Sequence, residues 1–211
     1  MITIKDFCEG IGLNEEVSRQ VLAYKMDYEV YENFRRLFKE DKKHFIEEIE
    51  SREDARMFAL ALYCRLGTEV YQEYQKRGIS DEIYYDTFSD LRIWSDACMR
   101  KYHVTGLMEY GWLCLPLELK IFRLGRLQFE PTEAKEDIDV NGRTVKVGTK
   151  VLEVHIPEGR PLNDAECEES FRKADEFFGG EYEAYICTSW LVAPEIKKIV
   201  SPESNIAKFQ D

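Results

Sequence analysis

Residues that commonly bind metal ions are scarce in this sequence. It contains three histidines and six cysteines, and it has neither a C-x-x-C nor an H-E-x-x-H segment. Structural zinc sites draw on such closely spaced ligands. We therefore expect no metal site. The cysteines are scattered singly, and we expect most of them to be reduced, buried thiols, as in proteins of a reducing compartment.

The chain also lacks an excess of positive charge. Lys and Arg total 29 against 41 Asp and Glu, which gives a net charge of −12, and acidic residues are in excess in both halves. Phosphate backbones and anionic membrane surfaces attract basic proteins. The charge therefore argues against nucleic-acid and membrane partners.

No long hydrophobic run is present. The longest plain apolar stretch lies near residues 57–64, far short of the ~20 residues of a membrane helix. The first residues include Asp6 and Glu9 where a signal peptide would be apolar. With 44% hydrophobic and 33% charged residues, the composition is that of an ordinary folded protein, and we expect it in the cytoplasm.

The first half of the chain, residues 1–112, has the apolar spacing of a helical domain. Hydrophobic residues recur every three or four positions, and Thr3, Asn14 and Ser80 stand where a helix N-cap belongs. The aromatic stripes are expected to form the core. The predicted helices are Thr3–Glu9, one that begins after Asn14, the stretches around 28–38 and 45–49, Arg52–Arg77, Ser80–Arg100 and Gly106–Leu115.

After Pro116 the pattern changes to strands and turns, which predicts an α+β fold with a mixed sheet. Asn141-Gly142 between two β-branched runs indicates a hairpin. The other predicted elements are the strands Ile121–Glu130, Val151–Pro157 and Tyr182–Leu191, a helix Asp164–Phe178 and a last helix Pro194–Val200.

Each of the three strands carries polar residues on one face. Such alternation is typical of a sheet with one face on the core and one in water. The outer face here would carry residue types that also perform catalysis. They are Arg126, Gln128 and Glu130 in the first strand, Glu153 and His155 in the second, and Cys187 and Ser189 in the third.

His155 is the best single candidate for a catalytic group. An imidazole can take a proton from an incoming amine or hydroxyl near neutral pH, and Glu130 or Glu153 would orient it. The alternative is a histidine that is merely hydrogen bonded within the sheet. Arg126 and Arg160 are candidate anion ligands, because a guanidinium can form two parallel hydrogen bonds to an anion. The alternatives are a structural ion pair of Arg126 with Glu130 or Glu153, which we expect, and a solvated Arg160.

Cys187 offers a different chemistry. Within hydrogen-bond reach of His155 it would be a nucleophile, as in a Cys-dependent hydrolase or thioesterase. Ser189 follows the same logic with weaker support. The alternative for Cys187 is a buried thiol.

Four segments carry a family resemblance: RLGRLQFE (Arg123–Glu130), VHIPEGRPL (Val154–Leu162), TSWLVAP (Thr188–Pro194) and SNIAKF (Ser204–Phe209). They resemble a bacterial family of acyltransferase-domain proteins, in which a helical N-terminal domain precedes a GNAT-like domain. The resemblance implies a helical domain at 1–112 and a GNAT-like domain at 113–211 that is incomplete at its C-terminus. It also implies an N-acyltransferase that uses a coenzyme A thioester and an unidentified amine acceptor.

The resemblance further implies where coenzyme A would bind. Strand Val151–Pro157 would pair with the pantetheine arm, and Tyr182–Leu191 would splay from it to open an acyl slot. The loop before helix Asp164–Phe178 would hold the pyrophosphate. The residues implied at the cofactor are Gly159, Arg160 and Asn163, to which we add Trp190, either in the acyl pocket or as a core anchor.

A non-catalytic binding or interaction module on the same fold is the alternative function. The implied phosphate loop has one glycine, Gly159, where the general GNAT pattern has two small residues. Acidic side chains such as Asp164 and Glu166 follow directly and would compete with a phosphate at the helix start. The sequence leaves a homo-oligomer open.

Overall fold

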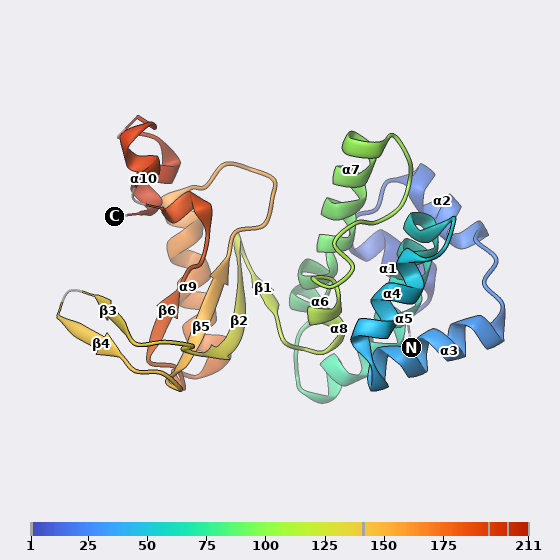
Figure 1. Ribbon diagram of the computed structural model, residues 1–211, viewed down its shortest axis with the longest axis horizontal. Helices are drawn as coiled ribbons and strands as arrows, with labels where there is room; N and C mark the ends of the chain where they lie inside the picture. Colours follow the sequence, from blue (N-terminus) through green and yellow to red (C-terminus); the bar gives the residue numbers. More distant parts are fainter. Residues whose placement is uncertain (1, 141, 194, 202, 211) are drawn as a thin grey trace. The chain divides into compact units, whose positions relative to one another are not determined.

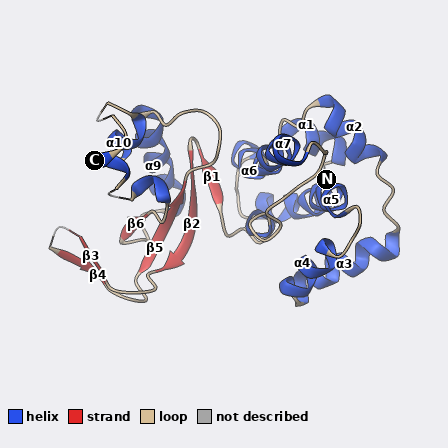
Figure 2. Cartoon of the chain, turned by 45° about the horizontal axis from the view of Figure 1, so that its top comes forward, coloured by secondary structure: helices blue, strands red, loops and turns tan. Residues whose placement is uncertain are grey.

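The computed structural model describes residues 2–140, 142–193, 195–201 and 203–210 (Figure 1). They form two compact units, one up to Leu119 and one from Lys120 onward. Of the helices in these ranges, none combines the length and apolar character that a membrane span requires. The α+β class predicted from the sequence is confirmed: the first unit is built of helices and the second holds all the described strands (Figure 2).

The helical unit packs around its longest helix, α5. Residues Phe58 to Cys64 of α5 are all almost completely buried. The hydroxyl groups of Tyr63, Tyr74 and Tyr84 lie in this core and donate to backbone carbonyl oxygens at 2.7–2.8 Å, so their burial leaves no polar group unpaired. The helices are α1 (Ile4–Gly10), α2 (Glu15–Ala23), α3 (Tyr28–Glu40), α4 (Lys42–Glu50), α5 (Ala55–Lys76), α6 (Asp81–Phe88), α7 (Asp90–Tyr102) and α8 (Cys114–Leu117).

The predicted caps are confirmed, but two helix predictions are wrong. Thr3, Asn14 and Ser80 each accept a hydrogen bond from the backbone of the first turn. The predicted helix Ser80–Arg100 is divided at Ser89, whose hydroxyl donates to the carbonyl oxygen of Asp86 at 2.6 Å. The predicted helix at 106–115 is only the single turn α8, because a helix cannot include the positive φ of Gly106 and Glu109.

The second unit is a mixed sheet covered on one face by a helix. The order of its strands is β1-β2-β5-β6, antiparallel except for the β5–β6 pair, and β3 and β4 form a separate hairpin. Helix α9 packs on the sheet and connects β5 to the parallel strand β6. The predicted strand Val151–Pro157, helix Asp164–Phe178 and strand Tyr182–Leu191 therefore form a βαβ unit. The bounds are β1 (Phe122–Leu124), β2 (Leu127–Glu133), β3 (Ile138–Val140), β4 (Arg143–Val145), β5 (Lys150–His155), α9 (Asp164–Phe178), β6 (Ala184–Ile186), the 3-10 turns η1 (Trp190–Val192) and η2 (Ile196–Lys198), and α10 (Asn205–Phe209).

The predicted strand Ile121–Glu130 is in fact a tight hairpin. Leu124 pairs with Leu127, and Gly125 takes a φ of +82° in the turn between them, a conformation that favours glycine. The predicted hairpin around Asn141 is confirmed in its two strands, although Asn141 itself lies outside the described residues.

The third predicted strand is also shorter than expected. Regular pairing ends at Ile186, and Ser189 starts the turn η1 by accepting a hydrogen bond from the Leu191 N–H at 3.2 Å. Trp190 is therefore on a surface turn, 71% exposed, and is not a core anchor. The predicted helix Pro194–Val200 is the short turn η2, with Pro194 outside the described residues.

The expectation that the polar face lies in water is wrong for two of its members. Gln128 is 1% exposed and Arg126 is 6% exposed. The turn that holds Arg126 packs on α9 through Ser170. This hydroxyl accepts from the backbone N–H groups of Arg126 (2.8 Å) and Leu127 (3.3 Å), and it donates to the carbonyl of Glu166 (2.7 Å).

We predict that Ser170→Ala destabilises the second unit, because it removes the side-chain acceptor of the buried Arg126 N–H group and a second contact to the Leu127 N–H group. The expected loss of unfolding free energy is about 1–3 kcal/mol, measured by urea unfolding followed by circular dichroism. Ser201→Ala is the control, since Ser201 is an exposed serine of the same unit and should cost far less. Equal midpoints for the two variants would contradict the role given to Ser170.

Candidate active site

The register of β2 against β5 gathers four polar residues on one face of the sheet. Gln128 lies opposite His155, and Glu130 lies opposite Glu153. Directly opposed residues share a face, so all four side chains leave the sheet on the side away from α9. The structure therefore brings the predicted base and both of its predicted orienting residues together.

The geometry of this group is compact. Nε2 of His155 lies 3.2 Å from Oε2 of Glu130, and the two side chains are 21% and 24% exposed. One ligand atom from each of Glu130, Glu153 and His155 lies within 4.8 Å of the others. Two carboxylates and an imidazole can serve as a proton acceptor with its acidic neighbours, or as ligands of a divalent cation.

An apolar cavity of about 500 Å³ lies where β5 and β6 part. The two strands pair only as far as Glu153 and Ile186, while β5 runs on to His155. The cavity is on the α9 side of β5, and Phe171 of α9 forms one wall. It is lined by Val154, Phe171, Tyr185, Ile186, Cys187, Val192, Phe209 and Gln210.

Cys187 belongs to this cavity and is not hydrogen bonded to His155. Burial, together with the nearby carboxylate of Glu153, raises the pKa of the Cys187 thiol, which disfavours the thiolate that a nucleophile needs. The structure thus places Cys187 as a lining residue of the cavity.

The loop between β5 and α9 is held by Arg126. Its guanidinium donates to the carbonyl oxygens of Pro157 (3.0 Å) and Arg160 (2.7 Å). The predicted ion pair of Arg126 with Glu130 or Glu153 is therefore wrong, because the buried turn points the side chain at the loop instead. Burial, reinforced by neighbouring Arg123, lowers the pKa of Arg126. Its Nε is buried and has no hydrogen-bond partner among the described residues.

The four residues predicted at the cofactor, Gly159, Arg160, Asn163 and Trp190, have different surroundings. Asn163 caps α9 by accepting from the Glu166 N–H at 3.2 Å. The side chain of Arg160 is 77% exposed and forms an ion pair with Glu166 at 3.1 Å. Gly159 has a φ of +142° and open space around it. Trp190 is exposed and is not among the residues that line the cavity.

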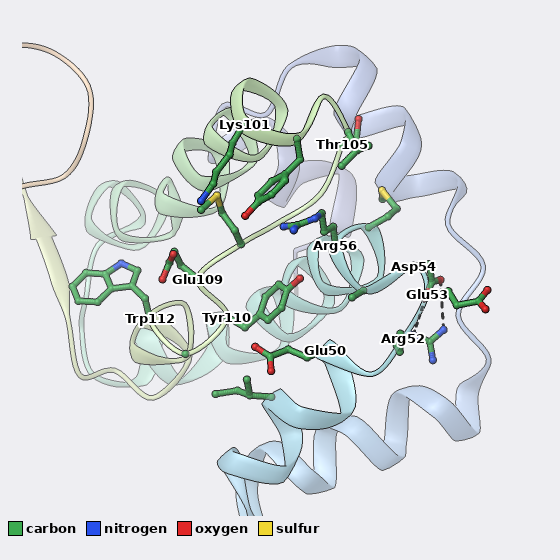
Figure 3. Close-up of a pocket in the computed structure, with 17 residues that line it drawn as sticks. Glu50, Arg52, Glu53, Asp54, Arg56, Lys101, Thr105, Glu109, Tyr110 and Trp112 are labelled. Carbon is green, nitrogen blue, oxygen red and sulfur yellow. Dashed lines mark hydrogen bonds and ion pairs between the residues drawn. The ribbon is translucent and has the colours of Figure 1, made fainter.

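The helical unit has a larger, polar cavity of about 870 Å³ that the sequence did not reveal (Figure 3). The Arg56 guanidinium stacks 3.5 Å from the centre of the Tyr102 ring. Lys101 and Arg56 beside the phenol lower the pKa of Tyr102. Charged residues such as Glu50 and Lys101 look like solvated helix faces in the sequence, so no periodic signal marks this cavity.

Solved structures of acyltransferases share the fold of the whole chain. One, in complex with decanoyl-CoA and teicoplanin, is 23% identical with a TM-score of 0.77, and the match covers 98% of this chain and 67% of that one. Another, in complex with CoA and 10C-teicoplanin, is 22% identical with a TM-score of 0.77 and the same coverage. The chain thus spans about two thirds of the length of these structures. No curated protein matches it.

Two family models account for nearly the whole sequence. Residues 121–211 match the GNAT-like C-terminal domain, and residues 2–119 match the N-acyltransferase N-terminal domain. The resemblance drawn from the four sequence motifs is thereby confirmed. The chain belongs to the family defined by the N-acyltransferase N-terminal domain, here followed by a GNAT-like C-terminal domain.

Proposed function

We propose that the chain transfers an acyl group from a coenzyme A thioester to an amine. The observation that carries this proposal is the apolar cavity at the parting of β5 and β6, one residue from His155. Its volume of about 500 Å³ is within the usual range of small-ligand sites, ~300–1,000 Å³. The solved acyltransferases of the same fold hold CoA or decanoyl-CoA.

Because β5 and β6 separate, the backbone of β5 has an unpaired edge to which the acyl-CoA donor could bind. Beyond Glu153, β5 pairs with β2 on one side but no longer with β6 on the other. The amide groups of the pantetheine arm can hydrogen bond to such an edge as an added strand does. The thioester would then lie in the gap, where the acyl chain reaches the cavity on one face and the polar group lies on the other.

The residues of the β5–α9 loop fit the phosphate end of the donor in part. Arg126 fixes the loop from within, and the side chain of Arg160 is exposed enough to turn from Glu166 toward an anion. Asn163 already occupies one N–H of the first turn of α9. Phosphate recognition would therefore rest on Arg160 and on the open backbone at Gly159 more than on the helix start.

His155 would accept the proton that the amine loses as it attacks the acyl carbon. Glu130, at 3.2 Å, would stabilise the imidazolium that forms and keep the ring oriented. Glu153, on the same face of the sheet as His155, would lie beside the same proton. Cys187 would contact the acyl chain.

The second candidate function is an interaction module without catalysis. The exposed apolar side chains of Trp190 and Ile199, 71% and 79% accessible, favour it, because large exposed hydrophobic groups often mark contact surfaces. A protein of this kind would neither be stabilised by acyl-CoA nor acylate an amine.

We predict that acyl-CoA raises the unfolding temperature and that the gain depends on the cavity. Octanoyl-CoA at 100 times its Kd should stabilise the protein by about 2.7 kcal/mol, and ATP should not. Val192→Trp should fill the cavity and reduce the advantage of octanoyl-CoA over CoA. Val147→Trp is the control, since Val147 is 63% exposed in the same unit. If ATP and octanoyl-CoA act alike, the donor site is absent.

We predict that His155→Gln lowers kcat for amine acylation by about 10²–10⁴-fold, the usual contribution of a general base. The KM for acyl-CoA should stay the same, because glutamine keeps a hydrogen bond and the donor site is untouched. Release of the coenzyme A thiol is the measurement. His44→Gln, at an exposed helix position, is the matched control. Full activity of His155→Gln would remove His155 as the base.

A further inference from the structure

Glu130 and Glu153 form a like-charged pair across two strands. They are direct partners in the β2–β5 register, and like charges directly opposite one another destabilise a sheet. Within the described ranges no Lys or Arg forms an ion pair with either carboxylate. A cation bound between the two carboxylates would remove this repulsion.

Two of the three ligand atoms in this group already have the spacing of a metal site. Nε2 of His155 lies 3.2 Å from Oε2 of Glu130. Two ligand atoms bound at ~2.0–2.1 Å to a tetrahedral ion are ~3.3 Å apart. One carboxylate oxygen of Glu153 completes a group whose atoms all lie within 4.8 Å of one another. Rotation of the flexible Glu153 side chain can bring this oxygen to the same spacing.

Gln128 supplies an independent sign of a ligand on this face. It is 1% exposed, and its Nε2 has no hydrogen-bond partner among the described residues. It lies directly opposite His155 in the register, and side chains opposed in this way start ~4.5–5.5 Å apart at Cβ. A buried amide donor without a partner is unfavourable. A water oxygen on an ion held by His155 would be an acceptor within its reach.

The mixture of ligands selects the class of ion. Mg²⁺ and Ca²⁺ prefer sites made of oxygen atoms, whereas an imidazole suits zinc and the other later first-row ions. Zinc bound by three protein ligands keeps a fourth position for water. The group on β2 and β5 offers one imidazole, two carboxylates and an amide donor that can hold such a water.

We propose that Glu130, Glu153 and His155 bind a divalent transition-metal ion of the zinc class. A water molecule in the fourth position accepts a hydrogen bond from Gln128. The ligands come from two strands and have no short spacing in the chain, which is why sequence motifs predict no metal site. Coordination uses the lone pair on Nε2 of His155, so the bound ion prevents this residue from taking a proton from an amine. This blocking of acyl transfer, unlike the metal site itself, rests on the proposed function.

The test measures binding of Zn²⁺ to the full chain without acyl-CoA. Calorimetry with chelator-buffered Zn²⁺ gives the affinity, and a spectrum of ring-labelled histidine locates the ion. The protein has three histidines, so His155→Gln assigns the signal of His155. We expect one Zn²⁺ to change this signal and Mg²⁺ at the same concentration to leave it in place. Equal binding of the two ions would reveal only a negatively charged surface and would overturn the site.

Two variants test the carboxylate ligands. Glu130→Gln and Glu153→Gln should each weaken Zn²⁺ binding at least tenfold. Each removes one member of a like-charged pair, so neither should lower the unfolding temperature of the metal-free protein. Glu133→Gln is the control, because Glu133 is an exposed carboxylate of the same strand as Glu130. An unchanged Zn²⁺ affinity of Glu153→Gln would overturn the three-ligand site.

Two other groups that can take up zinc are tested separately. His44 lies 3.8 Å from Glu48 on the exposed side of α4, and Cys187 is a free thiol in the apolar cavity. His44→Gln and Cys187→Ser should leave the Zn²⁺ affinity of the protein unchanged. If either of them abolishes binding and His155→Gln does not, zinc belongs to that residue and the proposal is wrong.

Gln128→Leu tests the water position. Loss of a group that holds a metal-bound water should weaken Zn²⁺ binding about tenfold without lowering the unfolding temperature of the metal-free protein. An unchanged affinity would remove Gln128 from the site. A fall in the unfolding temperature would show Gln128 to be a structural group instead.

The outcomes also distinguish this proposal from acyl transfer itself. If octanoyl-CoA stabilises the protein and Zn²⁺ leaves the His155 signal in place, the metal site is overturned and the donor site stands. If Zn²⁺ binds as expected and its saturation leaves amine acylation at the full rate, the metal site stands and His155 is not the base. Inhibition that His44→Gln retains and Glu153→Gln weakens would support both.

Discussion

The arrangement of the second unit depends on how the β1–β2 turn is held. Ser170 of α9 binds the backbone of the turn, and the buried guanidinium of Arg126 binds two carbonyl groups of the β5–α9 loop. One residue thus ties a hairpin, a loop and a helix together in a low-dielectric setting where its hydrogen bonds are strong. Arg126 thus supports the loop that precedes α9 from its buried side.

Strand β5 lies between β2 and β6, and each neighbour forms a different part of the site. Its antiparallel partner β2 supplies fixed pairs, and these place Glu130 and Gln128 beside Glu153 and His155. Its parallel partner β6 leaves it after three residue pairs, which opens the cavity on the opposite face. Because both arrangements meet at the end of one strand, a bond in the gap between β5 and β6 can be reached from a polar face and an apolar face at once.

The sequence predicted the parts of this site that depend on local rules. Alternation in Val151–Pro157 put Glu153 and His155 on one face, and a βαβ unit follows from strand and helix lengths alone. The hairpin at Gly125 was not predicted, although the alternation of apolar residues is interrupted there. Leu124 and Leu127 are three positions apart, whereas a continuous strand with one apolar face would have an even spacing. The burial of Gln128 has no local signal, because it depends on what covers the face and not on the strand.

The site keeps a pair of carboxylates where a sheet would be more stable without them. Proteins accept such local conflicts where binding or catalysis needs the charges in place before the ligand arrives. The cost is moderate, because Glu130 is still 24% exposed and water screens its charge. The β2–β5 register holds both carboxylates on the face that also carries His155. The charges are therefore beside the imidazole in the folded chain, without any rearrangement of the two strands.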